Sequence, residues 1–154
     1  MVHFHGQSVF GRNQGMTTVE LLIAILILSP IFVSTMYVFI KCSRLAEFSR
    51  HASMAMISCR DKLTEIENTD FSQILSQYQG STFNLSGLEG KGTVLIDDTT
   101  AGQLDITVSF AWKEKDGRVI GEDADLDGQI DVGEDLNGNG LLDSPVMLST
   151  RVYD

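Results

Sequence analysis

The segment from Leu21 to Ile40, LLIAILILSPIFVSTMYVFI, contains no charged residue. At a helical rise of about 1.5 Å per residue it spans about 30 Å, the thickness of the hydrocarbon core of a bilayer. It is apolar on every side of the helix, so it requires lipid or complete burial, and the rest of the chain is too small to bury it. The sequence therefore predicts one transmembrane helix, which Pro30 is expected to kink or locally loosen.

The helix is predicted to continue past the membrane. Apolar side chains recur at steps of three and four residues up to Ile66, and no Gly or Pro interrupts residues 31–68. We expect one helix over about 16–68, whose second half packs on a water-soluble domain. Cys42 and Cys59 would then lie roughly 25 Å apart along it, whereas a disulfide needs Cα atoms within about 7 Å, so no bond between them is expected.

A short second helix is predicted over 71–78, with Asp70 capping its start and Gly80 ending it. Residues 80–92 are rich in Gly and Ser and are interpreted as a loop. After them, apolar and polar side chains alternate in three segments, which predict strands over 93–97, 104–112 and 146–152.

Asp116-Gly117 is a turn signal after the second of these strands, and residues 118–120 are expected to start a return strand. Helices first and antiparallel strands afterwards predict an α+β fold. Its expected form is a long N-terminal helix, transmembrane in its first half, packed on a small antiparallel sheet.

Charge is segregated along the chain. The net charge is −10, and the segment from Glu122 to Asp143 holds eight carboxylates and no Lys or Arg. Binding to nucleic acid is not expected, because phosphate contacts need a basic face. Crowded carboxylates repel each other and gain from a bound cation.

Residues 123–134, DADLDGQIDVGE, match the twelve-residue calcium loop of an EF-hand in every ligand position. Ca²⁺ takes six to eight oxygen ligands, and Gly128 stands where the loop turns sharply. Gln129 would contribute its backbone carbonyl. The predicted ligands are Asp123, Asp125, Asp127, Gln129, Asp131 and Glu134.

A second copy follows directly over 135–146, DLNGNGLLDSPV. Val146 stands at position twelve, where the first copy has a bidentate glutamate, and the Asn-Gly pairs are also plain turn signals. Independent ion binding by this copy is left open. Its candidate ligands are Asp135, Asn137, Asn139, Leu141 and Asp143.

Gly133 and Pro145 oppose helices around these loops, so a helix–loop–helix sensor is not expected. The loops resemble EF-hand-like calcium loops of secreted bacterial proteins, including those of dockerin-like repeats. We expect Ca²⁺ to have a structural role in which it orders residues 123–143 and positions the last strand.

The residues before the apolar segment are polar, GRNQG (11–15), and are followed by Met16-Thr17-Thr18-Val19-Glu20. Glu20 lies at the edge of the predicted span, where an unpaired carboxylate is costly. A cut after Gly15 would create an α-amino group on Met16, one helical turn before Glu20, and the same pair can form between adjacent subunits.

This pattern closely resembles the processing site of type IV prepilins and pseudopilins. The resemblance covers about residues 11–40; Met16 replaces the commoner Phe, and Pro30 comes earlier than usual. It implies that a prepilin peptidase cuts after Gly15, that Met16 is methylated and that Glu20 is the assembly carboxylate. The implied organisation is a leader (1–15), a transmembrane and filament-core helix (16–40), and an amphipathic helix with a small β-domain (41–154).

The resemblance implies a minor pilin or minor pseudopilin of a type IV pilus or a type II secretion-like filament. The implied partners are other subunits, the prepilin peptidase, an inner-membrane assembly platform and lipid. The implied location is the bacterial inner membrane, crossed once, with the C-terminal domain in the periplasm. The alternative is a membrane-anchored calcium-binding adhesion module that does not polymerise. An enzyme is not expected, because no catalytic set of side chains occurs in the sequence.

Overall fold

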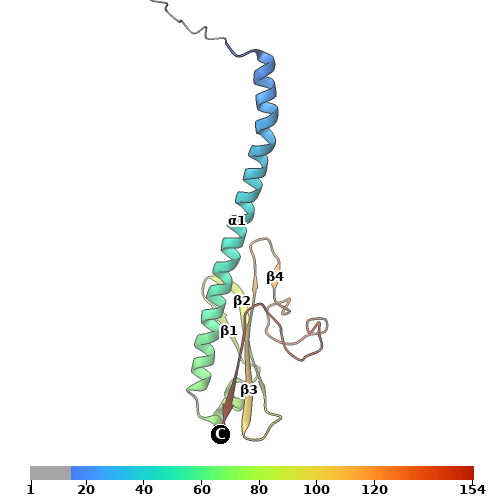
Figure 1. Cartoon of the computed structure of the whole chain (residues 1–154). Coiled ribbons are helices and arrows are strands. Elements are labelled where there is room, and N and C mark those ends of the chain that lie inside the picture. Colours follow the sequence, from blue (N-terminus) through green and yellow to red (C-terminus); the bar gives the residue numbers. More distant parts are fainter. Residues whose placement is uncertain (1–14) are drawn as a thin grey trace, which may run out of the picture. The chain divides into compact units, whose positions relative to one another are not determined.

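The computed structural model describes residues 15–154, so the predicted leader before Gly15 lies outside the described residues. The chain divides into two compact units between Ser43 and Arg44. One helix, α1 (Thr18–Glu67), begins in the first unit and ends in the second (Figure 1). Its bounds agree with the helix predicted over about 16–68.

In the first unit, α1 is long and apolar enough to cross a membrane, and its most apolar part is not buried by any of residues 15–154. Pro30 lies inside the helix, which continues through it. Because proline has no N–H, the carbonyl of Leu26 loses its helical donor. Ser29 Oγ donates to that carbonyl at 3.4 Å, as hydroxyl side chains do in membrane helices.

The second unit contains one antiparallel sheet. Its strands are β1 (Thr82–Leu85), β2 (Leu88–Asp97), β3 (Gln103–Lys113), β4 (Val119–Ile120) and β5 (Met147–Tyr153). They follow the order β1-β2-β3-β4, and β5 pairs with the first part of β3, beside the two-residue strand β4. The predicted α+β fold is confirmed: a long apolar N-terminal helix is packed against a small antiparallel sheet.

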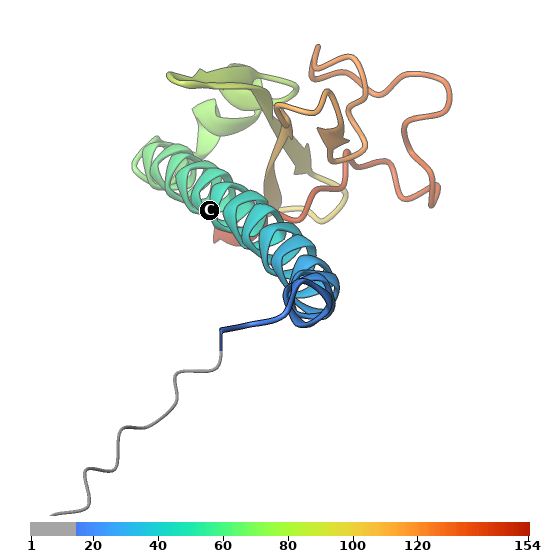
Figure 2. The same cartoon turned by 90° about the horizontal axis from the view of Figure 1, so that it is seen from above.

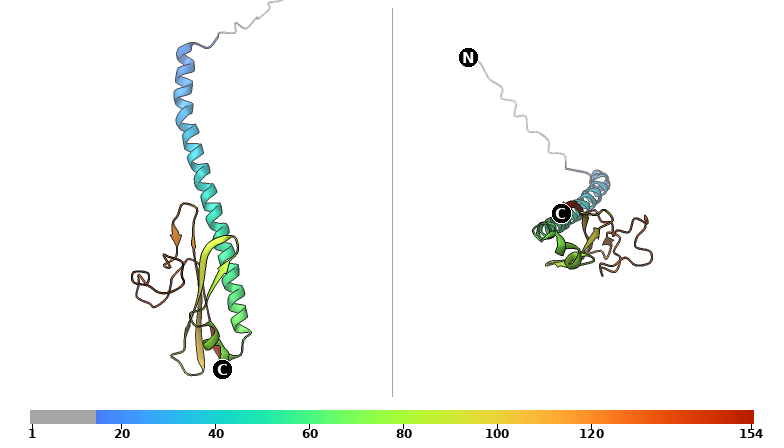
Figure 3. Two further views of the ribbon diagram at one scale, coloured as in Figure 1. Left: turned by 180° about the vertical axis from the view of Figure 1, so that it is seen from behind. Right: turned by 90° about the horizontal axis from the view of Figure 1, so that it is seen from below.

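The core is formed by side chains of this sheet and of the part of α1 that belongs to the second unit. Figures 2 and 3 show this part of the helix lying beside the sheet. Ala55, Cys59 and Ile66 of α1 are fully buried, and Phe110 and Trp112 are the largest buried side chains of the sheet. Each large apolar side chain buried in this way contributes about 1.5–3 kcal/mol. Both cysteines are free, as expected from their separation along the helix.

Helix α2 (Phe71–Tyr78) has the predicted bounds. Gly80 follows it with φ +67°, a left-handed conformation that glycine adopts without strain and that ends the helix as expected. The prediction for Asp70 was wrong in one respect. Asp70 stands at the N-cap, but its side chain makes no capping hydrogen bond. The backbone nitrogen of Gln73 donates instead to the Asp70 carbonyl, at 2.8 Å.

The prediction of a loop over residues 80–92 was also wrong, because β1 and the start of β2 form a hairpin there. Gly90 and Gly92 lie within β2 where a larger residue would not fit. A Cβ atom at Gly92 would come within 2.2 Å of the Phe83 ring, and one at Gly90 within 2.4 Å of the Ala111 carbonyl. These glycines therefore allow close packing within the sheet.

Candidate metal centre

The acidic segment, residues 122–143, connects β4 to β5 and is closed at its base. Glu122 N donates to the Asp143 carbonyl at 2.8 Å, and Ser144 Oγ donates to the Phe110 carbonyl at 2.6 Å. The segment also contacts the sheet through Gly128, where a Cβ atom would lie 2.5 Å from Thr82 Cγ2. The two ends of the segment are therefore bonded to each other, and the chain is held to the sheet just after the segment and in its first loop.

In the first loop, the Asp123 carboxylate organises the backbone. Asp127 N donates to Asp123 Oδ1 at 3.1 Å and Gly128 N donates to Asp123 Oδ2 at 3.0 Å. Gly128 has φ +80°, and Leu126 is the one non-glycine residue among the described ones with a positive φ, +63°. The chain thus wraps tightly around the first predicted ligand.

Glu134 closes the loop from its other end. Its Oε1 accepts from Ala124 N at 2.8 Å and its Oε2 accepts from Asp131 N at 3.2 Å. Asp123 and Glu134 are 1% and 7% exposed, whereas carboxylates are almost never buried this far unless they are paired. Two buried acids beside each other indicate a place for a cation.

Five of the six predicted ligands come together in two overlapping groups that share Asp125. In each group, one carboxylate oxygen per residue lies within 4.8 Å of the others. The groups are Asp123, Asp125 and Glu134, and Asp125, Asp127 and Asp131. The backbone carbonyl of Gln129 stays a predicted ligand. Hard carboxylate oxygens at this spacing suit Ca²⁺.

The electrostatics of the loop favour a cation. Burial raises the pKa of the Asp123 carboxyl above its ordinary value, the hydrogen bond from Gly128 N opposes the rise, and the charge of Glu134 adds to it. Without a cation, the loop therefore holds a carboxylate where ionisation is costly. A divalent ion at this position would remove that cost.

The second loop repeats the hydrogen bonds of the first one, twelve residues later. Asp135 Oδ1 accepts from Asn139 N at 3.0 Å, and its Oδ2 accepts from Gly140 N at 2.9 Å. Asn137 and Asn139 accept from the nitrogen two residues later, as Asp125 and Asp127 do. Asp143 interacts with both asparagine side chains. The structure therefore brings together four of the candidate ligands, Asp135, Asn137, Asn139 and Asp143. The fifth, Leu141, joins this network through its backbone nitrogen, which donates to Asn139 Oδ1.

Glu122 is the site residue that the sequence reasoning missed. Its Oε2 accepts from Asp143 N at 3.1 Å. In the first loop, Glu134 Oε2 accepts from the corresponding nitrogen, that of Asp131. Glu122 thus makes in the second loop a contact that Val146, at position twelve, cannot make. The signal for it was present, since Glu122 precedes Glu134 by the same twelve residues that separate the two loops.

At the other end of the chain, Gly15 and Met16 lie before α1, and Glu20 lies in its first turn. Glu20 N donates to Thr17 Oγ1 at 3.3 Å, so Thr17 caps the start of the helix, which the sequence reasoning also missed. Thr17 with Glu20 three residues later is a capping-box sequence. The backbone nitrogen of Glu20 therefore takes part in the first turn of the helix, and the Glu20 carboxylate stays the predicted assembly residue.

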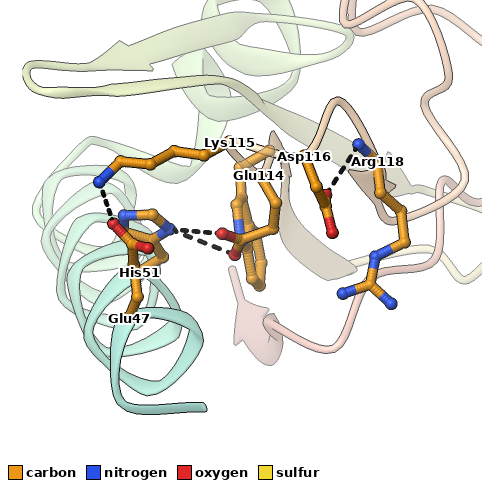
Figure 4. A network of polar contacts seen from close by, with 7 residues as sticks. Glu47, His51, Glu114, Lys115, Asp116 and Arg118 are labelled. Carbon is orange, nitrogen blue, oxygen red and sulfur yellow. Dashed lines mark hydrogen bonds and ion pairs between the residues drawn. The ribbon is translucent and has the colours of Figure 1, made fainter. Parts of the chain in front are cut away.

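A second polar cluster joins α1 to the turn after β3 (Figure 4). His51 Nδ1 lies 3.2 Å from both oxygens of Glu114, and Trp112 Nε1 donates to Glu114 Oε1 at 2.8 Å. Lys115 forms an ion pair with Glu47, which lowers the pKa of that carboxyl. These contacts connect α1 to the sheet, and they engage the one histidine that the structure describes.

Comparison with known proteins gives no match to this chain among protein-family models, curated proteins or solved structures.

Proposed function

We propose that this protein is a structural subunit of a type IV pilus or of a type II secretion-like filament, of the minor pilin or minor pseudopilin kind. One observation carries the proposal. The first half of α1 is apolar, is not buried by any of the residues that the structure describes, and carries Glu20 in its first turn, four residues after Met16. An unburied apolar helix of this length requires lipid or the helices of other subunits.

The chemistry of assembly follows from the position of Glu20. A carboxylate carried into an apolar environment costs several kcal/mol unless a cation pairs with it. Cutting after Gly15 creates that cation, the α-amino group of Met16, which keeps its charge after methylation. Pairing between the amine of one subunit and Glu20 of its neighbour then favours the assembled helices over isolated ones.

Calcium has a structural role in this proposal. The first loop would hold one ion through the carboxylates of its two groups, and Glu122 would help the second loop to hold another. The eight carboxylates of the acidic segment repel one another without cations. Bound calcium orders the segment and fixes the chain where it enters β5, and millimolar calcium outside the cell suffices even for weak sites.

The proposal is tested at the N-terminus of the protein isolated from its own cells. Mass spectrometry is expected to find a chain that begins with methylated Met16. A chain that still begins with Met1 would overturn the filament proposal. It would leave the alternative, a membrane-anchored calcium-binding adhesion module that keeps its leader and does not polymerise.

A further inference from the structure

The acidic segment presents apolar side chains to solvent. Val132 is fully exposed and Leu136 is 79% exposed, which makes them the most exposed large apolar residues of the second unit. They stand among eight carboxylates, none of which forms an ion pair with a Lys, Arg or His among residues 15–154. These two aliphatic side chains, four residues apart in a charged segment, leave apolar area that a partner could cover.

Helix α1 carries a surface with positively charged side chains around an exposed aliphatic one. Arg50, Ser53, Ile57 and Arg60 follow one another at steps of three and four residues, so they share one face of the helix. All four are exposed, and this face points away from Ala55 in the core. Ile57 is 61% exposed, and neither arginine forms an ion pair within the described part of the chain. We call these four residues the basic face.

We infer that the acidic segment of one copy of this chain docks on the basic face of a second copy. The charges are complementary: the segment carries −8, which two bound Ca²⁺ ions would reduce to −4, and the basic face carries Arg50 and Arg60 beside one exposed acid, Asp61. Each surface also has an exposed aliphatic centre, Val132 with Leu136 on one and Ile57 on the other. Apolar contact supplies affinity, and the surrounding charges supply orientation.

The two surfaces are different, so this contact is head-to-tail. Such an interface leaves one free acidic segment and one free basic face on every pair. It therefore adds further copies, into a filament or, where the rotation closes, into a ring. The inference rests on the proposed function in one respect, which is that subunits are crowded together in a filament. Exposed ion pairs are weak and screened by salt, so the high local concentration in a membrane or a filament strengthens the contact.

Disulfide cross-linking between two kinds of full-length chain tests the contact in the membrane. One chain carries Ile57→Cys, the other carries Val132→Cys, and both carry Cys42→Ser. Oxidation is expected to give a dimer when the two chains are expressed together and little when either is expressed alone. A chain with Ser149→Cys in place of Val132→Cys is the geometric control and is expected to give little dimer with Ile57→Cys.

Charge variants test the cause of the docking. Arg50→Glu with Arg60→Glu is expected to lower the yield of mixed dimer at least about tenfold, whereas Arg118→Glu, an exposed arginine away from this face, leaves it unchanged. Absence of the mixed dimer, or an unchanged yield in the double variant, overturns the docking. Filaments that form without the mixed dimer overturn the docking alone. A mixed dimer without filaments keeps the docking and overturns the filament proposal.

Discussion

Glu122 Oε2 accepts a hydrogen bond from the backbone nitrogen of Asp143, at 3.1 Å. The contact repeats the one between Glu134 and Asp131 in the preceding loop, at 3.2 Å. Glu122 thus brings to the second loop a carboxylate from outside its twelve residues, and this is the basis for proposing two calcium ions instead of one.

Changing Glu122 to Gln is expected to weaken one of the two proposed calcium sites, since the second loop then loses a charged oxygen. We expect the affinity of one site to fall at least about tenfold, about 1.4 kcal/mol, while the other keeps its affinity. Calorimetric titration of the full chain in detergent measures both. Glu89→Gln, which changes an exposed carboxylate on β2, is the control. Two unchanged sites in the Glu122 variant would contradict the proposal.

Gly128→Ala is expected to detach the first loop from the sheet. Gly128 has φ +80°, and a Cβ atom would meet Thr82 Cγ2 at 2.5 Å and Thr93 Oγ1 at 3.0 Å. Gly138→Ala is the matched control, because Gly138 has φ +73° and open space around it. Gly138→Ala is destabilised only by backbone strain, about 1–2 kcal/mol. Gly128→Ala has the same strain and in addition the steric clash of its Cβ atom with Thr82 and Thr93. Thermal unfolding with calcium should show a larger loss for Gly128→Ala; equal losses would mean that the loop is not docked.

The sequence predicted the helices, the later strands and the first loop because their signals are local. The periodicity of the apolar residues predicted α1, and the fixed spacing of acidic residues and Gly128 predicted the loop from Asp123 to Glu134. The hairpin of β1 and β2 could not be predicted in this way, since Gly90 and Gly92 disfavour strands locally. They are needed because Phe83 and Ala111 approach from other strands. Glu122 was missed for a similar reason: its partner Asp143 lies at the far end of the segment.

Glu114→Ala is expected to destabilise the fold by about 1–3 kcal/mol. The substitution leaves the indole N–H of Trp112 and the ring of His51 without the carboxylate that they share, and unsatisfied buried polar groups cost about this much. Lys115→Ala is the control, because that side chain is 80% exposed and its ion pair with Glu47 contributes little. Denaturant unfolding of both variants measures the difference. A loss for Glu114→Ala as small as that of the control would show that the cluster does not stabilise the helix–sheet contact.

The stability of the fold is expected to decrease in alkaline solution because of Cys59. Burial raises the pKa of the Cys59 thiol to about 12, whereas a cysteine in the unfolded chain ionises near pH 8.5. The unfolded state therefore loses its proton first, and the stability falls as the pH rises from about 8.5 to 12, by up to about 1.4 kcal/mol per pH unit. Unfolding measured across this range should show the slope in the wild type and a smaller one in Cys59→Ala. Equal slopes would contradict this contribution.

Thr17 and Glu20 separate the start of the helix from the assembly of the filament. Thr17→Ala removes the oxygen that accepts from Glu20 N, at a cost of about 1 kcal/mol to the first turn, but it leaves the Glu20 carboxylate in place. Glu20→Gln keeps the size and the backbone nitrogen but removes the charge that would pair with the amine of Met16. We expect both variants to insert into the membrane and only Glu20→Gln to be poorly incorporated into filaments, as measured by the amount of subunit in sheared filaments. If Thr17→Ala is excluded as strongly as Glu20→Gln, the geometry of the first turn, and not the charge of Glu20, controls assembly.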